Sequence, residues 1–211
     1  MIAVLDYGIG NLRSAEKALL QAGADARLVT DPDEAASADA LVLPGVGSFG
    51  ACVTALRNSG LHHAVYDAAE RSKPLLGICI GFQMLFSESE ESPGIPGLGI
   101  LDGAVLQIPT KEKLPQMQWN KLTILHPDTS LMFGGFSGAE PWFYFVHSYA
   151  AYPIGGVENP AVAAVCDYGG NVTAAVEKGS LWATQFHPEK SGALGLALLS
   201  QFVRFAGVGA K

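Results

Sequence analysis

The sequence lacks the features that mark disulfide-bonded, zinc-binding, nucleic-acid-binding or membrane proteins. It has only three cysteines, Cys52, Cys79 and Cys166, and no Cys-x-x-Cys pair, so neither a disulfide scaffold nor a metal site is indicated. It has no basic run and a formal net charge of −7, which argues against nucleic acid or an anionic membrane as a partner. Its N-terminal apolar run is too short for a signal peptide or a membrane span. We therefore expect a cytoplasmic protein that acts on small molecules or proteins.

What the sequence does contain is an alternation of short apolar runs and helical patterns. Strands are predicted at 2–5, 27–30, 40–43 and 75–78, with helices at 12–21, from 32, at 51–58 and at 61–72. Such alternation is typical of a parallel sheet with crossover helices. After a Pro-Gly break at 93–97, six strands are predicted at 104–108, 117–125, 142–149, 162–165, 172–176 and 181–186, then a helix at 194–205. The 211 residues thus predict one α/β domain with antiparallel strands at one edge of a mostly parallel sheet.

The most informative segment is 74–83, which places Cys79 between Gly77 and Gly81 where an apolar strand gives way to a helix. A turn of this kind points the side chain out of the sheet, and the glycines permit close backbone approach. The start of a helix favours the thiolate, which is the nucleophilic form of cysteine. A cysteine in an ordinary strand is more often a small buried hydrophobe. The position of Cys79 at a strand-to-helix turn between two glycines instead favours a nucleophile, placed at the carboxyl end of a central strand.

A cysteine nucleophile requires a base, and His187 is the best candidate. It follows a predicted strand and stands two residues before Glu189. In extended chain these two side chains point to the same side, so the carboxylate can accept a ring N–H and fix the tautomer. The other histidines considered, which we expect to be structural or solvated, are His62, His63 and His126. The sequence therefore predicts a Cys79, His187 and Glu189 triad.

The glycine-rich segment 43–50 offers backbone N–H groups for a developing oxyanion at another strand end. It also matches Gly-x-Gly-x-x-Gly, so a dinucleotide site is an alternative. That site needs an acidic residue near the end of the next strand, where Cys79 stands, and Glu70 falls within a predicted helix. The turn at 8–13 lacks the third glycine, and no phosphate-binding P-loop occurs. An oxyanion loop is the favoured interpretation, and no cofactor is expected.

Three of these segments resemble the class I, triad-type glutamine amidotransferases: 43–47, 77–83 and 185–189. The resemblance extends over nearly the whole chain. Four further stretches resemble one branch of them, the glutaminase subunits of imidazole glycerol phosphate synthase in histidine biosynthesis: 6–14, 119–120, 144–149 and 187–191. The resemblance implies the three-layer α/β fold of that class.

The resemblance also implies a mechanism and a set of site residues. Cys79 would attack the carboxamide of glutamine and form a thioester, while His187 carries the proton to the departing ammonia. The residues implied to stabilise the oxyanion or hold glutamine are Gly45, Val46, Gly47, Ile80, Gln83, His147, Ser148 and Tyr149. Ammonia would pass to a separate, barrel-shaped cyclase subunit docked over the site. The implied docking residues are Asn11, Trp119, Tyr144 and Lys190.

Three departures from the family pattern and three alternative functions remain at this point. Gln118 stands where relatives usually have glycine, and Ile80 and Phe82 replace the commoner leucine and methionine. A second amidotransferase branch, serving anthranilate, aminodeoxychorismate or pyridoxal phosphate synthesis, would share the triad and differ at the docking face. A cysteine peptidase or hydrolase of related fold would work alone and ignore glutamine analogues. A non-catalytic interaction module would not need the triad residues together.

Overall fold

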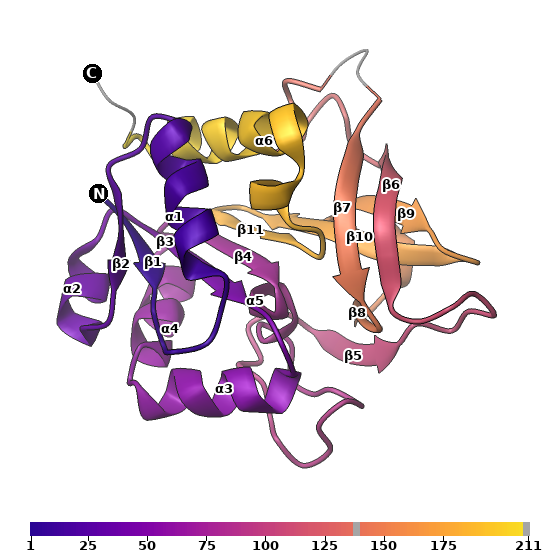
Figure 1. Ribbon diagram of the computed structural model, residues 1–211, viewed down its shortest axis with the longest axis horizontal. Coiled ribbons are helices and arrows are strands. Elements are labelled where there is room, and N and C mark those ends of the chain that lie inside the picture. The colour runs from indigo at the N-terminus through magenta and orange to yellow at the C-terminus, as the bar shows by residue number, and fades with distance from the viewer. Residues whose placement is uncertain (137–139, 209–211) are drawn as a thin grey trace.

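A computed structural model describes residues 1–136 and 140–208 (Figure 1). The first half alternates strands and helices in the predicted order: β1 (Ile2–Leu5), α1 (Leu12–Gln21), β2 (Ala26–Val29), α2 (Pro32–Ser37), β3 (Ala40–Gly45), α3 (Phe49–Asn58), α4 (His62–Glu70), β4 (Leu75–Cys79) and α5 (Ile80–Gln83). All predicted elements of this half are present, with ends displaced by at most two residues. Helix α2 shows why its start could be predicted from the sequence. The Asp31 side chain accepts hydrogen bonds from the N–H groups of Asp33 and Glu34, and Pro32 begins the helix.

The second half is mostly strands: β5 (Gly103–Gln107), β6 (Gln116–Ile124), β7 (Trp142–His147), β8 (Tyr149–Pro153), β9 (Val162–Asp167), β10 (Asn171–Lys178) and β11 (Leu181–Thr184). Short 3-10 turns η1 (Gly156–Glu158) and η2 (Pro188–Lys190) follow β8 and β11, and α6 (Gly192–Phe205) comes last. The prediction of one strand over 142–149 is wrong, because the chain leaves β7 at Ser148 and β8 pairs with β5 instead.

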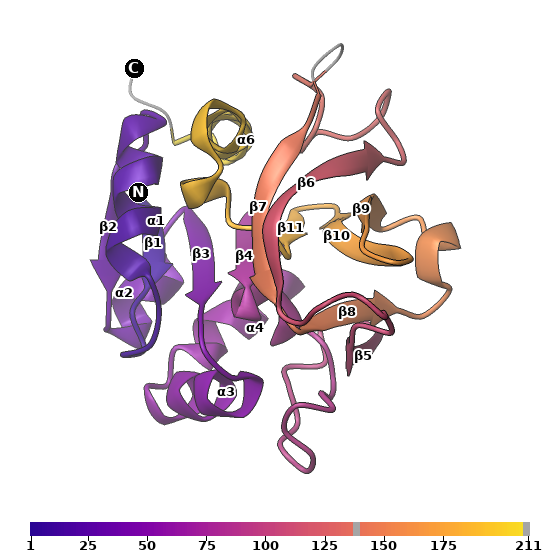
Figure 2. The same ribbon diagram turned by 45° about the vertical axis from the view of Figure 1, so that its right-hand side comes forward.

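The main sheet has nine strands in the order β2-β1-β3-β4-β11-β10-β9-β6-β7. Strands from β2 to β11 in that order are parallel, and the remaining neighbours pair antiparallel. Helices α1 and α6 cover one face and α3 and α4 the other, while β5 and β8 form a separate antiparallel pair (Figures 1 and 2). The predicted fold class is confirmed, and most of the antiparallel strands extend the main sheet itself.

The core lies where this sheet is covered on both faces. Every residue of β1, β3 and β4 is buried, as expected for parallel strands with helices on each side. On β11, the ring of Trp182 stacks on Phe205 of α6 with centroids 5.0 Å apart. Among residues 1–136 and 140–208, none of the helices has the length and apolar character needed to cross a membrane.

Candidate active site

Strand β4 delivers Cys79 to the carboxyl edge of the sheet in a strained turn. The backbone of Cys79 has φ 56° and ψ −110°, a conformation that costs a non-glycine residue about 1–3 kcal/mol. A Cβ at position 81 would lie 1.8 Å from the carbonyl oxygen of Leu43, and one at Gly77 would lie 3.1 Å from the main chain of Phe82. Gly81 is therefore required by space, because β3 and α5 approach so closely at this turn, and a side chain at position 77 would make a tight contact with α5.

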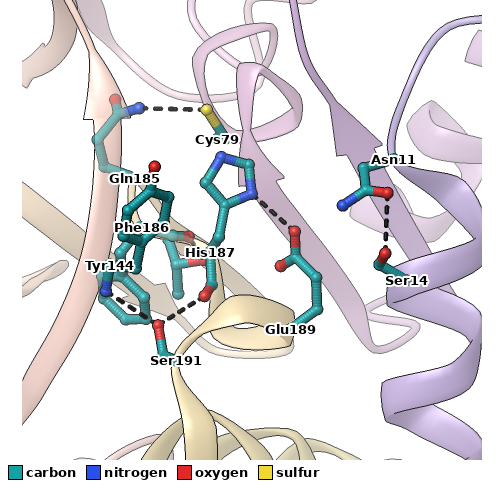
Figure 3. Close-up of polar contacts among 10 residues, drawn as sticks. Asn11, Ser14, Cys79, Tyr144, Gln185, Phe186, His187, Glu189 and Ser191 are labelled. Atoms are coloured by element: carbon teal, nitrogen blue, oxygen red, sulfur yellow. Dashed lines mark hydrogen bonds and ion pairs between the residues drawn. The ribbon is translucent and has the colours of Figure 1, made fainter. Parts of the chain in front are cut away.

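His187 and Glu189 form a buried pair beside the thiol. The Nδ1–H of His187 donates to Oε1 of Glu189 over 2.7 Å, and the two side chains are 2% and 3% exposed. The other ring nitrogen faces the sulfur of Cys79 (Figure 3). Burial disfavours the charged ring, but hydrogen bonds to Cys79 and Glu189 outweigh it and raise the pKa of His187 to about 10. The imidazole can therefore hold a proton at neutral pH.

The main chain of His187 is fixed by strand β7 and by Ser191. The N–H of His187 donates to the carbonyl of Tyr144 over 3.0 Å. The hydroxyl of Ser191 donates to the carbonyl of His187 over 2.6 Å and accepts from the N–H of Tyr144 over 3.0 Å (Figure 3). These three bonds set the position of the ring, because the residue itself lies outside any regular strand.

Two side-chain amides, those of Gln83 and Gln185, form a hydrogen-bonded row that ends at Cys79. Nε2 of Gln83 donates to the carbonyl of Tyr149 over 2.8 Å and to Oε1 of Gln185 over 3.0 Å. Nε2 of Gln185 in turn donates to Sγ of Cys79 over 3.8 Å. The Tyr149 carbonyl also accepts from Nδ1–H of His147 over 2.8 Å. Burial lowers the pKa of His147 to about 4 against the effect of that bond, so this ring is neutral.

A cavity of about 480 Å³ opens in front of the thiol. Of the residues predicted for the site, those that line it are Asn11, Val46, Gly47, Cys79, Ile80, Gln83, His147, Ser148, Tyr149, His187 and Lys190. Gly45 lies behind the wall, where a Cβ would come within 2.8 Å of the Gly81 nitrogen. In residues 1–136 and 140–208, no three His, Cys, Asp or Glu side chains are grouped to hold a metal ion.

The loop that carries Val46 and Gly47 is held from behind by two buried side chains. The hydroxyl of Tyr7 donates to the carbonyl of Pro44, and the thiol of Cys52 donates to the carbonyl of Val46 over 3.2 Å. Burial raises the pKa of Cys52 to about 11, so this thiol keeps its proton. Both carbonyls are thereby directed into the protein, and Gly47 turns the chain with φ 93°.

Trp119, Tyr144 and Lys190 form an aromatic and cationic cluster beside the cavity. The rings of Trp119 and Tyr144 meet edge to face with centroids 6.4 Å apart, and Nζ of Lys190 lies 6.0 Å from the Tyr144 ring. Only Lys190 of these also lines the cavity. Gln118 continues β6 in regular register opposite Phe145 and is exposed, so its replacement of glycine leaves a regular strand there.

Several residues of the site were missed by the sequence reasoning. Glu91 lines the cavity and accepts from the N–H of Phe49 over 2.6 Å, and Pro115 and Val146 line it too. Glu91 lies in an acidic loop whose sequence resembles any solvated surface segment. Gln185 is the first residue of the Gln-Phe-His-Pro-Glu segment, and Ser191 follows that segment by two residues. Their closeness to His187 in the sequence could have indicated a role in the site.

Comparison with known proteins identifies the class. The profile of the family described as Glutamine amidotransferase class-I matches residues 3–204. The structure of PurLQS from Thermotoga maritima is similar with a TM-score of 0.75, covering 97% of both chains at 23% identity. The glutaminase domain of CTPS from Trypanosoma brucei with bound acivicin has a TM-score of 0.66, covering 96% of this chain and 93% of that one at 16% identity. These two structures show the fold, and the family match shows that the chain is a class-I glutamine amidotransferase.

Curated relatives narrow the assignment. The imidazole glycerol phosphate synthase subunit HisH of Methanothermobacter thermautotrophicus is 49% identical over 203 residues, covering 96% of this chain and 98% of that one. The subunit of the same description from Deinococcus radiodurans is 47% identical over 206 residues, covering 96% and 93%. The chain therefore belongs to the family of HisH subunits of imidazole glycerol phosphate synthase, the glutaminase subunits of histidine biosynthesis. This membership decides against the other amidotransferase branches and against a peptidase.

Proposed function

We propose that Cys79, His187 and Glu189 hydrolyse glutamine to glutamate and ammonia in this cavity. One observation carries the proposal: the thiol of Cys79 and the imidazole of His187, which are distant in the sequence, face each other at the cavity wall, and the buried carboxylate of Glu189 is bonded to the far side of that ring. A nucleophile, a base and a group that orients the base are what acyl transfer from an amide requires.

In the first half of the reaction, the Cys79 thiolate attacks the carboxamide carbon of glutamine. The C–N bond then breaks, His187 gives its proton to the leaving nitrogen, and ammonia and a thioester result. In the second half, water attacks the thioester and gives a proton to His187, the C–S bond breaks, and glutamate leaves. Glu189 keeps the proton on Nδ1 throughout, so that Nε2 alone exchanges protons with the reacting groups.

Backbone and side-chain groups around the thiol suit the two ends of glutamine. Val46, Gly47 and Ile80 line the cavity together with Cys79, and we assign to their main-chain N–H groups the negative charge that develops on the carboxamide oxygen. At the other end, Glu91 and the buried Oε1 of Gln83, which has no hydrogen-bond partner among residues 1–136 and 140–208, are acceptors for an α-ammonium group. We assign glutamine an orientation along this axis, with the main chain at 147–149 as the second wall.

We further propose that the chain, as one domain over 1–211, forms a cytoplasmic heterodimer with a barrel-shaped cyclase subunit and binds neither nucleic acid nor membrane. Free ammonia would largely become protonated in water, so it must pass to the cyclase through a protected route, where imidazole glycerol phosphate and an aminoimidazole carboxamide ribotide form. The proposed docking face comprises Asn11, Trp119, Tyr144 and Lys190. Trp119 is 49% exposed beside the cavity, and exposed tryptophans of this kind are frequent interface anchors.

The test uses the chain assembled with that cyclase. Cys79→Ala is expected to abolish glutamine-dependent synthesis and to leave synthesis from ammonium salts unchanged, because the second site is untouched. Cys166→Ala, which truncates another buried thiol away from the cavity, is expected to retain both activities. Glutamine hydrolysis by the Cys79→Ala variant would contradict the proposed chemistry. Activation by an anthranilate-type or pyridoxal phosphate synthase in place of the cyclase would contradict the proposed partner.

A further inference from the structure

The row of amides beside Cys79 has a direction that is set by the main chain. A carbonyl oxygen can only accept hydrogen bonds, so the group that Gln83 presents to the carbonyl of Tyr149 over 2.8 Å must be its NH2. The second hydrogen of that NH2 is directed to Gln185 over 3.0 Å, which must therefore present its oxygen. Both glutamines are buried, at 1% and 0% exposure, so water does not compete for these positions.

This direction determines what Cys79 meets. With its oxygen turned to Gln83, Gln185 has only its NH2 left for the sulfur of Cys79, 3.8 Å away (Figure 3). An NH2 group donates and cannot accept; a thiol sulfur is a weak acceptor for it, and a thiolate is a stronger one. A hydrogen bond to an ionised acceptor is also about twice as strong as one between neutral groups.

We propose that Gln185 is a catalytic residue, a hydrogen-bond donor that holds the sulfur of Cys79 as the thiolate before glutamine is attacked. The inference rests on the proposed function, in which that thiolate is the nucleophile. Gln185 and His187 then both contact the sulfur. The Tyr149 carbonyl and Gln83 act through Gln185 and are positioning groups in this respect.

Apart from His187, which is a second donor to the sulfur, the titratable groups near the sulfur do not supply such a donor. His187 faces it after β11, with Glu189 behind the ring, and Tyr7 and Cys52 approach from the end of β1 and from α3. The hydrogens of Tyr7 and Cys52 are directed to the carbonyls of Pro44 and Val46. Burial raises the pKa of Tyr7 far above its usual value, so Tyr7 stays neutral.

The chain contains a matched control. Gln116 is also fully buried, and its Nε2 donates to Sγ of Cys166 over 3.6 Å, outside the residues that line the cavity. Gln116→Met and Gln185→Met each replace an amide by an unbranched apolar side chain of similar length and remove one N–H to sulfur contact. Gln185→Glu keeps the oxygen that accepts from Gln83 and replaces the donor to sulfur by an acceptor.

The experiment measures the rate at which iodoacetamide alkylates Cys79 between pH 5 and pH 10, with the modified residue located by mass spectrometry. We expect Gln185→Met to slow alkylation at pH 7 by about tenfold, the size of one hydrogen bond to a charged group, and to move the half-maximal rate to higher pH. Rates should converge with wild type at the alkaline end. Gln185→Glu should be slower still, and Gln116→Met should follow the wild-type profile.

Two results separate this inference from the proposed function. If Gln185→Met and Gln185→Glu follow the wild-type pH profile, or if Gln116→Met shifts it equally, the assignment of Gln185 is wrong. Alkylation of Cys79 that leaves glutamine hydrolysis by the complex unchanged would instead remove Cys79 as the nucleophile. Should Gln185→Met fold poorly, Gln185→Glu decides alone, because it keeps the side-chain shape and the bond from Gln83.

Discussion

Glu189→Gln tests whether the carboxylate acts by its charge or only by its position. The side chain accepts from Nδ1–H of His187 over 2.7 Å, and both residues are nearly buried. Glutamine has the same length and retains one acceptor oxygen. Its NH2 takes the place of Oε2, which has no hydrogen-bond partner in the described part of the chain. The substitution therefore keeps the geometry and removes the negative charge.

The expected loss follows from the strength of the bond. A hydrogen bond to a charged group contributes about 1.5–3 kcal/mol and a neutral one about 0.5–1.5 kcal/mol. Because the neutral bond survives in Glu189→Gln, only the difference of about 1–1.5 kcal/mol is lost, equal to about a 5- to 13-fold decrease in kcat. The carboxylate forms no bond to substrate in the proposed mechanism, so KM is expected to change little.

The same substitution should alter how stability depends on pH. His187 binds its proton more tightly in the folded protein, where its pKa is about 10 against a usual value of 6.5, so protonation stabilises the fold. That contribution is complete below pH 6.5 and is lost as the pH rises through about 10. Glu189→Gln removes one of the two groups that raise this pKa. The difference in unfolding free energy between wild type and variant should therefore be largest near pH 6.5 and shrink toward pH 10.

Two measurements check these expectations: steady-state glutamate release by the assembled enzyme, and urea unfolding at several pH values. Glu177→Gln is the control, because Glu177 accepts three hydrogen bonds from segment 130–132 and lies outside the cavity. It should change stability and leave kcat unchanged. A Glu189→Gln enzyme as active as wild type, or as inactive as the Cys79→Ala enzyme, would refute the charge argument.

Three further tests examine other parts of the structure. Cys52→Ser keeps a donor for the carbonyl of Val46 and should retain kcat, whereas Cys52→Ala should lower it about two- to tenfold; equal kcat values for the two would contradict the loop anchor. Trp119→Ala should weaken cyclase binding about tenfold in titration calorimetry, and Trp142→Ala, the 42% exposed tryptophan of β7, should not; similar losses would contradict the docking face. Gly81→Ala should lower the unfolding free energy in urea by more than about 3 kcal/mol, since its Cβ would meet a carbonyl of β3 at 1.8 Å; wild-type stability would show that the turn can relax.

The first half of the fold was predictable because its signals are local. The alternation of apolar runs with helical patterns and the cap at Asp31 each act within a few residues. The second half was harder, since several strands there have no helix between them to set their order. Nothing local indicates that β11 enters the sheet parallel to β4. The two strands are far apart in the sequence, as the separation of 106 residues between Gln185 and Cys79 shows. We expected the strand at 181–186 to be one of the antiparallel additions, and its parallel pairing with β4 corrects that expectation.

The bend at Ser148 shows the same limit for the site. The apolar pattern of 142–149 predicts a single strand, and no glycine or proline interrupts it. The chain nevertheless changes sheets there, because the pairing of β8 with β5 is a contact between distant segments. The residues around the bend carry the Tyr149 carbonyl into the cavity wall, so an error of one strand boundary conceals the group that orients Gln83. The triad was predicted together with Glu189, which orients the base, whereas Gln185 and Ser191, which contact Cys79 and the main chain of His187, were not.

The position of the triad follows from the register of three parallel strands. Pro44 of β3 and Thr184 of β11 both pair with Ile78 of β4, so the three strands end at one level of the sheet. Each chain continuation then emerges at the same edge: the glycine loop from β3, Cys79 from β4 and the His187 segment from β11. A shift of β11 by two residues would move the imidazole by about 6.6 Å and take it out of reach of the thiol. The antiparallel strands prevent such a shift, because the His187 main chain is bonded to Tyr144 of β7 at the far edge. The parallel half of the sheet thus brings the reacting groups together, and the antiparallel half fixes the register on which their contact depends.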